Sequence, residues 1–66
     1  MELKDFIKEN RRLANLTQPD IAEKAGVGLR FIREMEQGKE TLRMDKVNQV
    51  LKLFGFKLGP VEMKRE

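Results

Sequence analysis

The sequence predicts an all-α domain of four helices followed by a short C-terminal β-strand. Through most of residues 1–55, apolar side chains recur at spacings of three and four, which is the period of a helix with one buried face. From Phe56 onward the apolar residues fall at every second position, which is the period of a strand. We therefore expect one domain over residues 1–55, a strand over residues 56–63 and a disordered tail over residues 64–66.

The first two helices have recognisable ends. We expect the first to run from about Glu2 to Ala14, with apolar residues on or beside its inward face at Leu3, Phe6, Ile7, Leu13 and Ala14. Thr17 and Asp20 have the spacing of a capping box, which predicts that the second helix begins directly after Thr17. Gly26 predicts the end of this helix, because glycine enters the left-handed conformation without a steric cost.

Three basic residues form a row along the first expected helix. Lys4, Lys8 and Arg12 stand four residues apart and could form a ridge that binds a polyanion. Their neighbours Asp5 and Glu9 largely neutralise this row. The sequence therefore favours a solvated helix face over a binding ridge at this position.

The third helix is expected from Leu29 to Gln37. At about 100° per residue, Ile32 and Met35 point toward a core, and four polar side chains lie on the opposite side: Arg30, Arg33, Glu34 and Gln37. Two helices joined by a short turn containing glycine form the helix-turn-helix pattern, in which the second helix enters the major groove of DNA. The spacing alone equally allows an ordinary helical hairpin whose outer face is solvated.

The end of the chain combines a helix with the alternating segment. A fourth helix is expected from Met44 to Phe54, with core positions at Met44, Val47, Val50, Leu51 and Phe54. The following strand would have no partner in a helical domain, and Pro60 suits only an edge strand. We therefore expect the strand to pair with its copy in a homodimer, through Phe56, Leu58 and Val61. The alternative is an extended tail that packs Phe56 and Leu58 on its own core.

The composition narrows the possible functions. The 66 residues carry a net charge of +3, a mild basic bias that suits a polyanionic partner but also a solvated surface. The chain contains no His, Cys, Ser or Tyr, so the usual nucleophiles and near-neutral bases are absent. We therefore expect no enzyme, no cofactor and no metal. The charged start and the lack of a long apolar run predict a cytoplasmic protein without a membrane anchor.

Several stretches resemble the phage-repressor (XRE) type of helix-turn-helix. They are the pattern LTQxxIAxxAGV from Leu16 to Val27, the pattern IxxMExGK from Ile32 to Lys39, then Leu42, and the helix end Leu53-Phe54-Gly55. Within that family, the run GVGLRFIREMEQGKETLRMDKVNQVLKLFG is most similar to HipB-type antitoxins, which are small repressors encoded beside HipA-type kinase toxins. The resemblance implies a four-helix DNA-binding domain, and the HipB-type members carry a short terminal strand that pairs across a dimer.

The resemblance also implies structural roles for individual residues. Arg11 and Glu36 match the positions at which phage-type repressors have an internal ion pair between the first and third helices. Gln18 matches a glutamine that holds the DNA backbone and supports the recognition helix. We expect neither Arg11 nor Glu36 to read bases.

The outer face of the third helix supplies the candidate DNA contacts. An arginine fork meeting guanine O6 and N7 is the commonest base-specific contact. The residues expected to contact bases are Leu29, Arg30, Arg33 and Glu34, although Glu34 could instead orient Arg30. The residues expected to contact the DNA backbone are Gln18, Gly28, Lys39 and Arg43, of which Lys39 and Arg43 could equally be solvated.

Together these features predict a sequence-specific repressor that binds an inverted-repeat operator as a homodimer. In the HipB-type reading it is the antitoxin of a HipBA-like operon, represses its own promoter and has a HipA-type kinase toxin as a partner. A stand-alone phage-type regulator and a protein-interaction module that does not bind DNA are the alternatives. The adjacent gene would separate the first two, and a mobility shift at two salt concentrations would separate both from the third.

Overall fold

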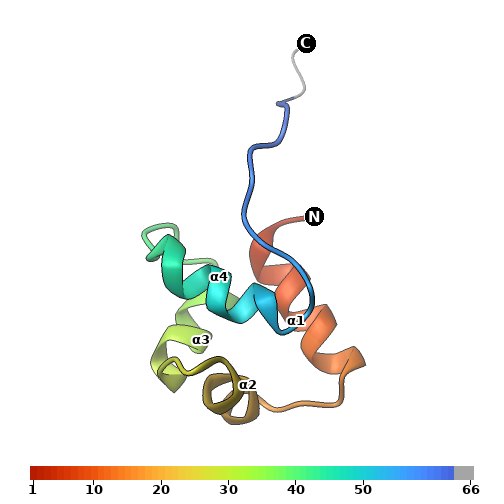
Figure 1. The fold of residues 1–66 in the computed structure, drawn as a ribbon, viewed down its shortest axis with the longest axis vertical. Helices are drawn as coiled ribbons and strands as arrows, with labels where there is room; N and C mark the ends of the chain where they lie inside the picture. Colours follow the sequence, from red (N-terminus) through yellow and green to blue (C-terminus); the bar gives the residue numbers. More distant parts are fainter. Residues whose placement is uncertain (64–66) are drawn as a thin grey trace.

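The computed structural model describes residues 1–63; residues 64–66, for which the sequence predicts a disordered tail, lie outside the described part. It contains the four predicted helices, arranged as in Figure 1: α1 (Leu3–Leu13), α2 (Gln18–Ala25), α3 (Leu29–Glu36) and α4 (Met44–Lys52). Helix α3 packs against both α1 and α2, while α4 packs against α2. None of these helices is long and apolar enough to cross a membrane.

The core lies where the four helices converge, and each helix contributes to it. Its buried apolar residues are Ile7, Ile21, Ala22, Ile32, Met35, Val47, Val50 and Leu51. Phe54, in the turn after α4, packs against this cluster from its edge. Fully burying one large aliphatic side chain stabilises a fold by about 1.5–3 kcal/mol, so a handful of such residues from separate helices holds the domain together.

Three positions predicted on buried faces are exposed, and the prediction is wrong for them. Leu13 is 79% exposed and Met44 is 68% exposed, and Ala14 is exposed as well. Leu13 is the last residue of α1, Ala14 caps that helix, and Met44 is the first residue of α4. The helical period continues to these ends, but no other element packs over them.

The capping box at the start of α2 is confirmed. The Asp20 amide donates to Thr17 Oγ1 at 3.2 Å, and the Thr17 amide donates to Asp20 Oδ2 at 2.8 Å. The hydrogen bond from the Thr17 amide lowers the pKa of the Asp20 carboxyl below its usual value. At the other end, Gly26 has a φ of 72°, the left-handed conformation expected of a helix-ending glycine.

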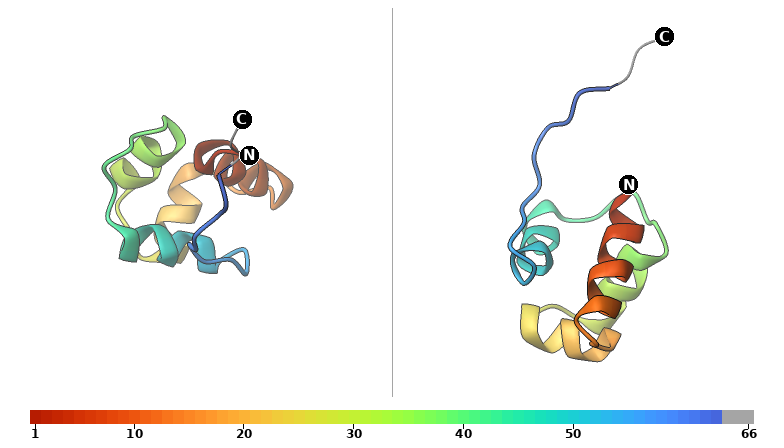
Figure 2. Two further views of the ribbon diagram at one scale, coloured as in Figure 1. Left: turned by 90° about the horizontal axis from the view of Figure 1, so that it is seen from above. Right: turned by 90° about the vertical axis from the view of Figure 1, so that its right-hand side faces the viewer.

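The β-strand predicted for residues 56–63 is not formed in the described chain. This segment instead leaves the helical body as an extended arm, as the two views of Figure 2 show. At its base, Phe56 makes an edge-to-face contact with Phe6 of α1, with 4.8 Å between ring centroids, and half-buried Leu58 packs against the core. The Leu58 amide donates to Asn48 Oδ1 at 2.7 Å. Leu58 thus packs on the core of its own chain, as in the alternative expectation, whereas Phe56 contacts Phe6 but stays 53% exposed.

The two hydrogen bonds of the capping box should respond differently to pH when one partner is replaced. Thr17→Ala removes the hydroxyl acceptor of the Asp20 amide and should cost about 1 kcal/mol of the free energy of unfolding near neutral pH, most of which should remain in acid. Asp20→Asn should be destabilising only near neutral pH. Because the pKa of Asp20 is lower in the folded chain than in the unfolded one, its charge stabilises the fold above the unfolded pKa. That contribution is lost as the pH falls through the folded pKa.

Urea unfolding of both variants and the parent chain, followed by circular dichroism from pH 6 to pH 2.5, tests this division. The gap between Asp20→Asn and the parent should close in acid, while the gap for Thr17→Ala should persist. If both gaps kept the same size throughout, the Asp20 carboxylate would not be the group that stabilises the start of α2.

Candidate nucleic-acid interface

The turn between α2 and α3 sets the direction in which α3 leaves the core. The Val27 amide donates to the Ala22 carbonyl at 3.0 Å, and the Gly26 amide donates to the Glu23 carbonyl at 3.3 Å. These bonds satisfy carbonyls at the end of α2, and Gly28 then occupies the N-cap position of α3. The result is a helix-turn-helix geometry with the compact turn that the sequence predicts.

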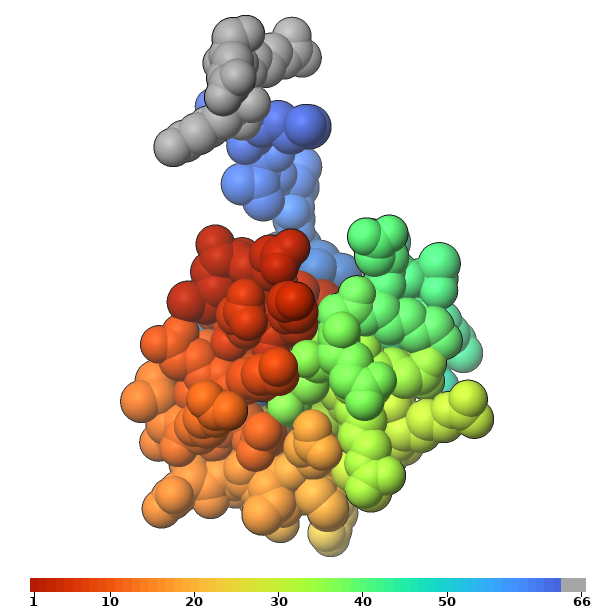
Figure 3. Space-filling view, turned by 180° about the vertical axis from the view of Figure 1, so that it is seen from behind, coloured from red at the N-terminus to blue at the C-terminus, as the bar shows by residue number. Residues whose placement is uncertain are grey.

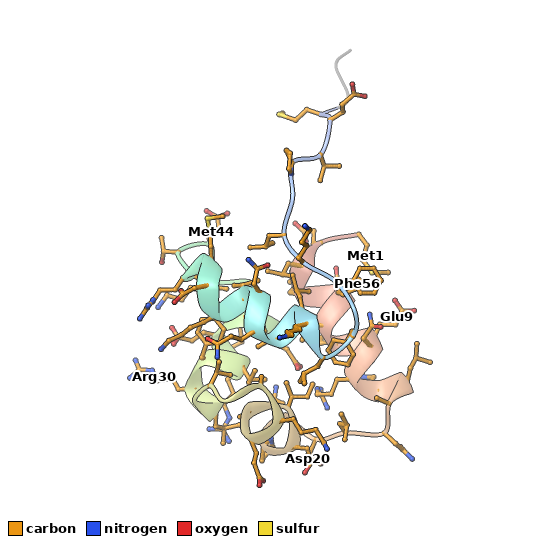
Figure 4. All side chains as sticks on the ribbon, in the orientation of Figure 1. Met1, Glu9, Asp20, Arg30, Met44 and Phe56 are labelled. Carbon is orange, nitrogen blue, oxygen red and sulfur yellow. The ribbon has the colours of Figure 1, made fainter. Side chains whose placement is uncertain are left out.

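Helix α3 has one buried side and one exposed side. Ile32 and Met35 are buried in the core, whereas Arg33 and Gln37 are exposed to solvent. The Arg30 side chain is 92% exposed and points away from the molecule, as Figure 4 shows. The guanidinium groups are therefore available to a partner and are not folded back onto the domain.

Glu34 is engaged within this exposed surface. Its carboxylate accepts a hydrogen bond from Lys39 Nζ, and its Oε1 lies 3.7 Å from Arg30 Nε. The hydrogen bond from Lys39 is the main cause that lowers the pKa of Glu34, and the charge of Arg30 acts in the same direction. Of the two roles that the sequence leaves open for Glu34, this arrangement corresponds to the orientation of Arg30.

The remaining predicted contact residues differ in how freely they can reach a partner. Leu29 is half-buried and packs against the core, so only part of its side chain is accessible. Arg43 pairs with Asp45 across 2.7 Å on the exposed surface. Gly28 is exposed, and a Cβ placed there would meet no other atom within 4 Å.

Beneath the exposed side of α3, three elements are joined at the Glu36 carboxylate. Arg11 of α1 donates to it twice, from Nε at 2.8 Å and from Nη2 at 3.0 Å, and Gln18 at the start of α2 donates from Nε2 at 3.1 Å. Arg11 also donates from Nη1 to the Leu16 carbonyl at 3.2 Å. Hydrogen bonding to Glu36 is the main cause that raises the pKa of Arg11. The structure thus brings Arg11 and Glu36 together, with Gln18 as a third member.

One feature of this surface was not predicted from the sequence. Lys4 and Lys8 of α1 line a depression together with Gln18, Arg33 and Gln37, from the same side of the molecule as α3. The spacing of the two lysines places them on one helix face. Only the packing of α1 against α3, which local patterns do not reveal, places that face beside Arg33.

Comparison with known proteins agrees with this geometry. Residues 7–61 match the model of a helix-turn-helix family. The chain is 51% identical over 45 residues to an uncharacterized HTH-type transcriptional regulator of Sinorhizobium fredii (strain NBRC 101917 / NGR234), a match that covers 68% of this chain and 59% of the relative. The chain thus matches less than two thirds of the length of that relative. It is also 38% identical over 59 residues to an uncharacterized HTH-type transcriptional regulator of Methanocaldococcus jannaschii, covering 89% of each protein.

The Glu36 network predicts an asymmetric response to mutation. The Glu36 side chain is only 3% exposed, so Arg11→Met would leave a buried carboxylate without its counter-ion. We expect a loss of about 3–5 kcal/mol in the free energy of unfolding, measured by urea denaturation. The double variant Arg11→Met with Glu36→Met should recover most of that loss, because no uncompensated charge remains.

Arg12→Met is the matched control for this series. Arg12 is the next residue of α1 and is exposed, so its replacement should change the free energy of unfolding by less than about 0.5 kcal/mol. Equal losses for Arg11→Met and Arg12→Met would contradict a structural role for the ion pair.

Proposed function

The chain belongs to the helix-turn-helix family, and on this basis we propose that it is a sequence-specific DNA-binding transcriptional repressor. The observation that carries the proposal is the outward direction of Arg30 and Arg33 on α3, a helix whose opposite side is held in the core. Such a helix can enter the major groove while its own domain stays rigid. Repression is steric: the protein bound at a promoter blocks transcription.

The proposed interface divides into residues that read bases and residues that position the protein. Arg30 and Arg33 offer planar forks to guanine, with Glu34 holding Arg30 and Leu29 able to touch a thymine methyl group. The backbone of the duplex is contacted by Gln18, Gly28, Lys39 and Arg43. Gln18 is well suited to this role because its side-chain amide already donates a hydrogen bond to Glu36, the last residue of α3.

The proposal includes a homodimer, because a single small module buries little surface on DNA. The end of the arm supports it: Val61 is 88% exposed and Met63 is exposed as well, although both are apolar. Two such arms pairing across a two-fold axis would cover these side chains. The recognition helices would then read half-sites about 34–36 Å apart in an inverted repeat.

We further propose that the repressor is an antitoxin that controls its own operon. This extension rests on the resemblance of residues 26–55 to HipB-type antitoxins. It requires a gene for a HipA-type kinase toxin next to the gene for this chain, and a physical complex of the two proteins. A neighbouring gene of another kind, together with specific DNA binding, would leave the protein as a stand-alone repressor.

Arg30→Ala tests the division between base reading and positioning. We expect this variant to lose about 1–3 kcal/mol of discrimination at one base pair of the operator, because the bidentate contact to guanine is removed. Lys39→Ala should instead weaken binding to all duplexes alike, because it removes a contact to the backbone. Competition titrations with the operator, its single-base-pair variants and a random duplex measure both effects. Equal losses of both variants on cognate and random duplexes would contradict the assignment.

Val61→Asp tests the dimer without disturbing the helical body. The side chain makes no buried contact in its own chain, so the circular dichroism spectrum and the melting temperature at low concentration should not change. Placing like charges at the proposed interface should shift the sedimentation velocity pattern from dimer to monomer. A dimer that survives this substitution at the same concentration would rule out pairing through the arm.

A further inference from the structure

The depression between α1 and α3 has the composition of a site for phosphate groups. Its lining comes from three helices and comprises Lys4, Lys8, Gln18, Arg33, Glu36 and Gln37. Figure 3 shows the face on which α1, the start of α2 and the end of α3 meet. Except for Glu36, these side chains are cationic or carry an amide that can donate a hydrogen bond.

The charge of this depression is positive because its acidic member is already neutralised. The Glu36 carboxylate is 3% exposed and is bonded to Arg11 and Gln18. Asp5 and Glu9, which the sequence suggested would neutralise the basic row, do not line this depression; they line a different one together with Lys8 and Arg12. Three cationic side chains, Lys4, Lys8 and Arg33, therefore line the depression, and the carboxylate in its lining, Glu36, already has its own counter-ion.

The two lysines are partly held in place by the fold. Both are half-buried, so their aliphatic stems are covered while the ammonium groups reach solvent. Lys4 Cδ would lie only 3.1 Å from a Cβ on Gly38, which shows how closely its stem approaches the turn after α3. The carboxylate of Glu2, 3.8 Å from Lys4 Nζ, belongs to an exposed side chain and competes weakly with a bound anion.

The cationic surface has a definite extent. It is continuous with the proposed recognition face through Arg33 of α3 and Gln18 at the start of α2. Beyond Lys4 the adjoining depression adds Glu2, Lys39 and Glu40, so its opposite charges balance. The excess of positive charge therefore runs from Arg33 to Lys4, and the adjoining depression adds no net positive charge to it.

We propose that this depression, which we call the α1 groove, binds the phosphate backbone of the same duplex that α3 enters. Lys4 and Lys8 contact phosphates flanking the half-site, and they extend the interface from the helix-turn-helix onto α1. The inference rests on the proposed function, because the groove lies next to α3 and would be filled by the strand bordering the major groove. These contacts add affinity and salt dependence but no base preference.

The test is the salt dependence of DNA affinity for the double variant Lys4→Gln with Lys8→Gln. Each phosphate contact contributes about 0.9 to the slope of log affinity against log salt, so the slope should become shallower by up to about 2. Affinity should fall by the same factor on operator and random duplexes, leaving the preference between them unchanged. The double variant Lys4→Arg with Lys8→Arg keeps the charges and should keep the slope close to that of the parent chain.

The matched control is Lys24→Gln with Lys52→Gln, which removes the same charge from a depression that shares no residue with the α1 groove. Its slope should stay close to that of the parent. If both double variants changed the slope equally, the effect would come from net charge and the groove would not be a contact site. If the groove variant bound with unchanged slope and intact operator preference, this inference would be overturned while the proposed function stood. If the parent chain bound no duplex in a salt-dependent manner, the proposed function itself would fail.

Discussion

The position of α3 depends on the bonds that converge on Glu36. A helix of eight residues is too short to be stable alone, so contacts to the rest of the domain must hold it. Ile32 and Met35 supply the apolar part of that hold, but apolar packing is not directional. The Glu36 carboxylate adds direction, because it accepts two hydrogen bonds from Arg11 and one from Gln18. Within residues 1–63 no buried side-chain nitrogen or oxygen lacks a partner, so the buried charge is fully compensated.

This arrangement separates stability from recognition within one short helix. The inward residues of α3 and the Glu36 network determine where the helix lies, and the outward residues contribute little to holding it there. Arg30 is nearly fully exposed, and its contact with Glu34 is an exposed ion pair of small energy. Substitutions on the outer face should therefore leave the fold unchanged, and under the proposed function they would alter base preference alone. The same separation holds in the α1 groove, because Lys4 and Lys8 line the same depression as Glu36 but are not among the residues bonded to it.

Sequence patterns correctly predicted the features that depend on residues close together in the chain. The capping box at Thr17 and the end of α2 at Gly26 could be read from sequence, because each involves residues a few positions apart. Leu13 and Met44 were placed wrongly because burial depends on a neighbouring element, and none covers those helix ends. The α1 groove was missed for the same reason. Asp5 and Glu9 share a depression with Lys8 and Arg12, but they do not line the one that Lys4 and Lys8 share with Arg33.

The alternating apolar residues of the arm are compatible with two structures, a strand paired with a second chain and an extended segment on its own domain. Alternate residues of an extended segment share one side, and here Leu58 packs against the core of its own chain while Phe56 contacts Phe6 at its edge. The Leu58 amide is bonded to Asn48 and the Phe56 amide to the Leu51 carbonyl, so neither is free to donate to a second arm, and Pro60 has no amide hydrogen. The proposed dimer contact is therefore confined to the end of the arm, around Val61 and Met63. The contact of Phe56 with Phe6 of α1 restricts the direction of the arm, which would lower the entropic cost of pairing in the proposed dimer.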